Sequence, residues 1–184
     1  TLPLAAGLLD ALRAYWGAFY IRVDPPVAPS SIVGLTLARS WTRPAIRLNR
    51  GMTVVLELSD DATARRARMS KHHRHELRRG QQCGLSWTAS NGPAQVDALV
   101  ALHGEMTRRK GIATAPQARR AAILSLCSHF ADDAVILVGS QDGRPITACF
   151  ARIFADRAFF HTAATGAAGL ACAASYAAVD ELAE

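Results

Sequence analysis

The dipeptide Asp142-Gly143 constrains the fold of this chain more than any other short feature. It lies between two apolar segments, Ala134–Gly139 and Ile146–Phe154, that have the composition of strands. Because Asp-Gly favours the positive φ angles of a two-residue hairpin turn, these segments are predicted to pair as antiparallel strands. Phe159–Ala164 is predicted to extend the meander, and Leu85–Thr88 to form a further short strand.

Segments with helical features surround this meander. Pro93 begins one predicted helix, and Thr114-Ala115-Pro116-Gln117 has the form of a capping box that begins another. Ser59 is predicted to cap a long helix that runs from about Asp60 to Arg79, and an Ala-rich helix follows the meander. The expected fold class is α/β, with a mixed, largely antiparallel sheet flanked by helices.

Composition narrows the functional classes. Half of the 184 residues are hydrophobic and a fifth are charged, which is typical of a globular protein. The sequence has neither an apolar run long enough to cross a bilayer nor the features of a signal peptide. We expect a cytoplasmic protein, one that can associate with the inner membrane surface because its net charge is +6.

The four cysteines are Cys83, Cys127, Cys149 and Cys172. Their spacing matches neither a redox pair nor a metal site, and three of them lie in apolar segments. Buried Cys usually behaves as a small hydrophobic residue. All four are therefore predicted to be free thiols in a reducing compartment.

Positive charge is concentrated in one region. Between Arg39 and Arg79 there are eleven Lys or Arg residues and four acidic residues. Within the predicted helix, Lys71, Arg74 and Arg78 fall on one stripe at about 100° per residue, and Arg79 lies beside them. These four residues are predicted to bind a phosphate-bearing ligand. A solvated, Arg-rich helix face is the alternative.

A second candidate site is the loop after the last predicted strand, where Gly166, Gly169 and Ala171 precede a helix. Small residues before a helix N-terminus let an anion approach backbone N–H groups. The alternative is a tight packing contact between this helix and the sheet.

Histidines offer little for metal chemistry. His72 and His75 could share a metal ion, but nearby carboxylates and thiols do not complete a site and arginines surround them, so no metal is expected. His161 lies within a predicted strand and is a weak candidate for a catalytic proton acceptor. Packing within the core is its more ordinary role.

Residues 53–85 resemble the FemAB-type, peptide-bridge-forming branch of the GNAT acyltransferase superfamily. In that pattern a strand ends in Leu-Ser and a basic helix follows. The matching positions are Arg74, Leu77, Arg79, Gly80 and Gly84, and downstream Arg109-Lys110-Gly111-Ile112 and Asp142-Gly143-Arg144-Pro145-Ile146.

The resemblance implies a GNAT-like fold in which the meander and the following helix form a donor cleft. It also implies an acyl-CoA or aminoacyl-tRNA donor and an amine-bearing acceptor. Ordinary GNAT enzymes have Gln/Arg-x-x-Gly-x-Gly/Ala in the pyrophosphate loop. This chain has Gly166-x-x-Gly169-x-Ala171, which departs from the pattern at its first residue. The departure weighs against coenzyme A binding and does not weaken an aminoacyl-tRNA donor, and both donors stay open.

The same resemblance predicts the domain organisation. Residues 1–50 are interpreted as the tail of a preceding GNAT-like domain, comprising a helix, a strand and an irregular linker. Residues 51–184 are interpreted as a GNAT-like acyltransferase domain that is incomplete at its C-terminus. Two alternatives follow for the sheet. Either the chain is a fragment of a two-domain protein and the sheet keeps an open edge, or the strand Phe19–Val23 completes the sheet, within one chain in permuted order or across a swapped homodimer.

The expected function is transfer of an activated acyl or aminoacyl group to an amine, with a phosphorylated donor that includes tRNA among its candidates. Positioning and an oxyanion donor can drive such a reaction without a nucleophilic residue. The alternative is a catalytically inactive GNAT-like module that binds RNA or anionic lipid through its basic helix.

Overall fold

The structure, a computed structural model, describes residues 61–154 and 157–184 continuously, with only short pieces before residue 61. The chain divides into two compact units, Thr1–Val55 and Leu56–Glu184. All helices and strands with described bounds lie in the second unit. The predicted strand Phe19–Val23 lies outside the described residues, and with it the proposed completion of the sheet. So does most of the strand that the resemblance implies before Leu58-Ser59, and Leu58 is described outside any strand.

The described part of the chain contains one antiparallel sheet with the strand order β1-β2-β3-β4. The hairpin prediction is confirmed, because Gln141 pairs directly with Arg144 and leaves Asp142 and Gly143 as the turn. These two residues have φ angles of 50° and 75°. The strands are β1 (Ser86–Ser90), β2 (Ala134–Gln141), β3 (Arg144–Phe154) and β4 (Arg157–Thr165).

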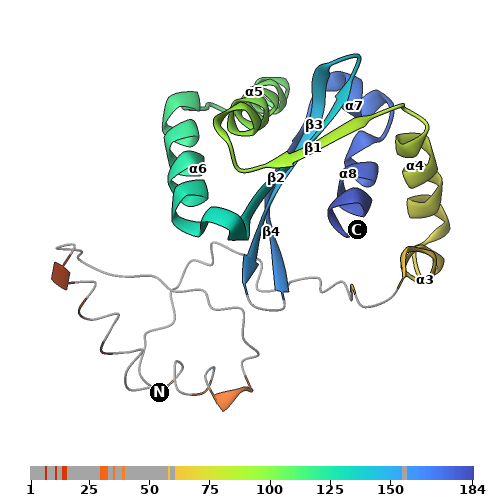
Figure 1. Ribbon diagram of the computed structural model, residues 1–184. Coiled ribbons are helices and arrows are strands. Elements are labelled where there is room, and N and C mark those ends of the chain that lie inside the picture. Colours follow the sequence, from red (N-terminus) through yellow and green to blue (C-terminus); the bar gives the residue numbers. More distant parts are fainter. Residues whose placement is uncertain are drawn as a thin grey trace. The chain divides into compact units, whose positions relative to one another are not determined.

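Helices cover both faces of this sheet, so the fold is α/β as predicted. Helices α5 and α6 lie on one face, and α4, α7 and α8 lie on the other (Figure 1). The described helices are α3 (Ala62–Ala67), α4 (Lys71–Gln81), α5 (Pro93–Arg109), α6 (Pro116–Phe130), α7 (Ala167–Ala171) and α8 (Ala174–Leu182).

Alternation along the central strands builds two cores. Ile136 and Val138 of β2 point into the larger core beneath α5 and α6, where they meet Phe150 of β3. Leu137 and Cys149 point to the opposite face and pack against α8. A strand buried on both faces must be apolar at successive positions, which explains the continuous apolar run in β2.

The long helix predicted from Asp60 to Arg79 is wrong, because two helices occupy this stretch. Asp61 caps α3, and the Ser70 hydroxyl caps α4 by accepting the N–H of His73 at 3.2 Å. The Arg74 guanidinium donates to the carbonyls of Ala67 and Met69 in the connection between the helices. Side chains therefore satisfy the backbone groups that an uninterrupted helix would have paired.

The Ala-rich C-terminal segment is likewise two helices. Ala173 has a φ of 60° and separates α7 from α8. Its carbonyl lies against Gly80 of α4, where a Cβ would approach it to 2.8 Å. The close approach of α4 to this turn therefore requires glycine at position 80.

Candidate functional site

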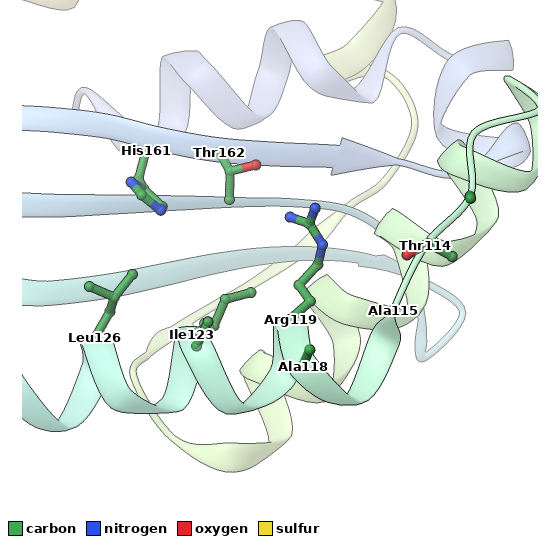
Figure 2. Close-up of a pocket in the computed structure, with 10 residues that line it drawn as sticks. Thr114, Ala115, Ala118, Arg119, Ile123, Leu126, His161 and Thr162 are labelled. Carbon is green, nitrogen blue, oxygen red and sulfur yellow. The ribbon is translucent and has the colours of Figure 1, made fainter. Parts of the chain in front are cut away.

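An open cavity of about 560 Å³ lies between α6 and β4. In Figure 2, Arg119, Ile123 and Leu126 extend from α6 toward the strand that carries His161 and Thr162. Thr114 and Ala115 form the wall where the chain enters α6. The cavity therefore brings together apolar side chains, two hydroxyl groups, one guanidinium and one imidazole, a mixture typical of a small-molecule site.

The end of α5 shapes one wall of the cavity. Gly111 has a φ of 66°, and the N–H of Ile112 returns to the carbonyl of Thr107 at 2.9 Å. Such a glycine-dependent turn ends a helix and redirects the chain. Residues 113–115 then cross beside β4 before α6 begins at Pro116.

The predicted capping box at the start of α6 is not formed. Ala115 is the N-cap residue, and within the described chain α6 receives no side-chain cap. Pro116 does occupy the first helical turn, as predicted. The capping failure leaves the Thr114 hydroxyl at the wall of the cavity instead of on the helix backbone.

His161 is placed by a β-bulge. Phe150 of β3 pairs with Thr162 and Ala151 pairs with Phe160, so His161 is an extra residue on β4. A bulge re-aims the side chain that it carries and is common beside active sites. Here it turns the imidazole toward the cavity (Figure 2).

The surroundings of His161 favour its neutral form. Its ring lies edge-on to Phe150, with the ring centroids 5.1 Å apart. His161 is exposed on its cavity side, but partial burial against the sheet lowers its pKa, and the positive charge of Arg152 lowers it further. A neutral imidazole near pH 7 is a competent proton acceptor.

A second histidine lies close to the positive charges of this region. His103 of α5 is buried, and its Nδ1 atom lacks a hydrogen-bond partner among the described residues. Burial lowers the pKa of His103, and the charges of Arg119 and Lys110 lower it further. The pKa of His103 therefore reports on the charge of Arg119.

The predicted phosphate loop is engaged by the chain itself. The Glu105 carboxylate accepts the N–H of Ala167 at 2.6 Å and lies against Gly166. A Cβ at Gly169 would overlap the carbonyl oxygen of Ile146 on β3. Both contacts favour the packing alternative for this loop, while phosphate binding there stays a prediction.

The basic helix is also partly engaged. Arg74 binds the carbonyls between α3 and α4, as described above. Arg79 donates to Glu76 Oε2 at 2.7 Å and to the carbonyl of Ala171 at 2.9 Å. Two residues from separately predicted sites, Arg79 and Ala171, therefore bind each other. In the part of the chain that is described, Lys71 and Arg78 are exposed and have no ion pair.

The structure thus separates the candidates that the sequence identified. Lys71, Arg74, Arg78 and Arg79 lie on α4, which packs against α8. His161 lines the cavity between α6 and β4, on the opposite face of the sheet. Gly166, Gly169 and Ala171 lie at the end of β4 and in α7, between Glu105 of α5, Ile146 of β3 and Arg79 of α4.

The histidines of α4 contact an aromatic ring. The rings of His72 and His73 lie edge-on to Tyr176 of α8, at centroid distances of 6.3 and 5.5 Å. Among the described residues, metal-ligating side chains do not gather in groups of three or more. None of the helices described here has the length and apolar character needed to cross a membrane. The four cysteines are free thiols.

Sequence reasoning did not identify Thr114, Arg119 or Glu105 as site residues. Thr114 and Arg119 come together with His161 only through folding. Arg119 is also followed by a second arginine, and the local sequence does not distinguish the two. Glu105 gave no local signal, because its partner, the N–H of Ala167, lies 62 residues away in the sequence.

The comparisons with known proteins add no family to this geometry: neither the scan against family models nor the search of curated proteins gives a match for this chain.

Proposed function

We propose that this chain transfers an activated acyl or aminoacyl group to an amine, with the cavity between α6 and β4 as the acceptor site. The observation that carries the proposal is His161, which a β-bulge turns toward the cavity and whose pKa is lowered. A neutral imidazole beside a site of small-molecule size is what deprotonation of an amine acceptor requires.

The chemistry needs few protein groups. The amine nitrogen attacks the acyl carbonyl, a C–N bond forms, and the bond to the thiol of coenzyme A or the ribose hydroxyl of tRNA breaks. His161 accepts the proton that the amine loses, and the leaving group takes up a proton in turn. Holding the two reactants together supplies most of the acceleration in such reactions.

The order of elements supports the proposal. One strand, two helices, three antiparallel strands and further helices follow one another from residue 86 to residue 182. This order is compatible with the GNAT-like fold that the FemAB-type resemblance implies. The donor, whether acyl-CoA or aminoacyl-tRNA, stays part of the proposal.

An acyl-transfer assay across pH tests this function. Purified protein is incubated with acetyl-CoA, or with aminoacyl-tRNA, and a panel of amines, and mass spectrometry detects the acylated product. The rate is expected to fall as the pH drops through the lowered pKa of His161, because protonation removes the base. His161→Gln should abolish this fall in rate at low pH. Failure of both donors with every amine would exclude the proposal.

The rival function is RNA binding through α4 without catalysis. Lys71 and Arg78 favour it, because both side chains are exposed and, among the residues described, neither has an ion pair. Contacts to phosphates make affinity fall steeply with salt. Arg78→Gln should therefore weaken RNA binding and flatten its salt dependence if this function is correct, and an unchanged salt slope would exclude it.

A further inference from the structure

Two successive arginines of α6 have opposite surroundings. Arg120 is exposed and donates to both carboxylate oxygens of Asp97 on α5, at 2.5 and 3.3 Å. Arg119 is half-buried on the wall of the cavity. Within the described ranges, Arg119 makes neither a hydrogen bond nor an ion pair.

An unpaired, partly buried guanidinium on the wall of an open cavity favours an anionic ligand. A ligand that covers it would remove its charge from water, which is costly unless the ligand supplies an opposite charge. Carboxylates are absent from the described residues that line the cavity, where Arg119 and His161 are the titratable groups. Lys110 and Arg152 add positive charge nearby, as the lowered pKa values of His103 and His161 show.

The start of α6 reinforces this field. Pro116 lies in the first helical turn, and the helix dipole places partial positive charge at this end. Thr114 contributes a hydroxyl group that is not used for capping in the described structure. These groups lie on the same wall as Arg119 and are suited to the oxygens of an anion.

We propose that the cavity is specific for an acceptor that carries a carboxylate as well as its amine, an amino acid or a short peptide, and that Arg119 binds this carboxylate. This inference rests on the proposed function. The planar guanidinium matches a carboxylate in bidentate geometry. A volume of about 560 Å³ suits a molecule of this size. Because Arg119 and His161 line one cavity, a single small molecule can contact both.

Calorimetric titration of the full chain, without an acyl donor, tests the assignment. The probes are free amino acids and dipeptides, each paired with its C-terminal amide, which keeps the amine and removes the carboxylate. At least one carboxylate form is expected to bind about tenfold or more tightly than its amide. Equal affinities across all pairs, or no binding by any carboxylate form, would overturn the proposal.

Variants of the two arginines provide a matched comparison. Arg119→Gln should abolish the preference for the carboxylate, while Arg120→Gln should retain it. Arg119→Lys keeps the charge without the bidentate geometry and should retain part of the preference, which separates a binding role from a folding defect. A full preference in Arg119→Gln would contradict the assignment of Arg119.

Inorganic phosphate forms a separate arm of the titration. If phosphate displaces the carboxylate probes at equal concentration, Arg119 serves a general anion site and the carboxylate assignment is wrong. Since no donor is present, a carboxylate preference can be found even if the acyl-transfer assay fails. The two proposals can therefore fail independently.

Discussion

Helices α4 and α6 both carry arginines, but the surrounding chain satisfies them differently. On α4, Arg74 binds backbone carbonyls and Arg79 binds Glu76 and Ala171. On α6, Arg119 lies at a cavity without an acidic partner among the described residues. A high density of positive charge therefore does not by itself identify a binding site. A guanidinium that is partly buried at a cavity and has no partner among the described residues, unlike the exposed Arg78, is the stronger indicator.

The largest expected effect concerns the loop that resembled a phosphate cradle. Gly169→Ala should lower the free energy of unfolding by about 1–3 kcal/mol, because the new Cβ would overlap the carbonyl oxygen of Ile146. Denaturant unfolding measures the change.

Gly104→Ala is the matched control, since outside its own helix backbone no described atom lies within 4 Å of a Cβ there. In the middle of α5 it should stabilise the protein by up to about 1 kcal/mol. Equal effects of the two changes would argue against tight packing at Gly169.

Glu105 tests whether the loop at Gly166 is packed or is a binding site. Glu105→Ala should destabilise the protein by about 0.5–1.5 kcal/mol, because a solvent-exposed hydrogen bond to the N–H of Ala167 is lost. Glu105→Gln keeps an acceptor and should cost less. Phosphate titration of both variants is the informative measurement. If Glu105→Ala gains phosphate affinity at Gly166 and Ala167, the loop is a binding site that Glu105 occupies, and the contrast with the cavity weakens.

Arg74 and Arg78 of α4 differ in their contacts and should differ in their contribution to stability. Arg74→Gln should cost about 0.5–1.5 kcal/mol of stability, because the carbonyls of Ala67 and Met69 lose a donor. Arg78→Gln changes an exposed side chain and should alter stability by less than about 0.5 kcal/mol. Thermal unfolding at equal salt concentration compares the two. If both variants unfold alike, Arg74 has no special structural role.

The smallest expected effect is a change in titration. Arg119→Gln removes one of the charges that lower the pKa of His103, so this pKa should rise while burial still holds it below its ordinary value. Arg120→Gln should leave it unchanged, because Arg120 pairs with Asp97. Histidine-resolved NMR titration follows both variants. If Arg119→Gln leaves the pKa of His103 unchanged, the Arg119 guanidinium does not lie near His103 in solution.

Local signals in the sequence predicted most elements of this fold. Asp142-Gly143 identified the hairpin, and Pro93 and Pro116 marked the starts of α5 and α6. The same local rules missed the break before α4, because Ser70 and Ser59 are equally good cap residues by sequence. Caps compete, and tertiary contacts decide between them.

The cavity could not be predicted in this way. Arg119 and Arg120 are adjacent and chemically identical. Only the packing of α6 against α5 brings Arg120 to Asp97 and leaves Arg119 at the cavity. The bulge that turns His161 depends on the register between β3 and β4, which no short motif specifies. Positions of charge could be predicted from the sequence, whereas their partners could not.

The most direct test of the central claim is an NMR map of where a carboxylate-bearing amine binds. Backbone amide shifts of the labelled full chain are recorded during titration with the tightest carboxylate probe from the calorimetric panel. We expect the largest changes at residues 113–123 of the loop and α6 and at His161 and Thr162 of β4. Changes confined to α4, at residues 71–81, or to residues 166–171 would contradict the assignment of this cavity.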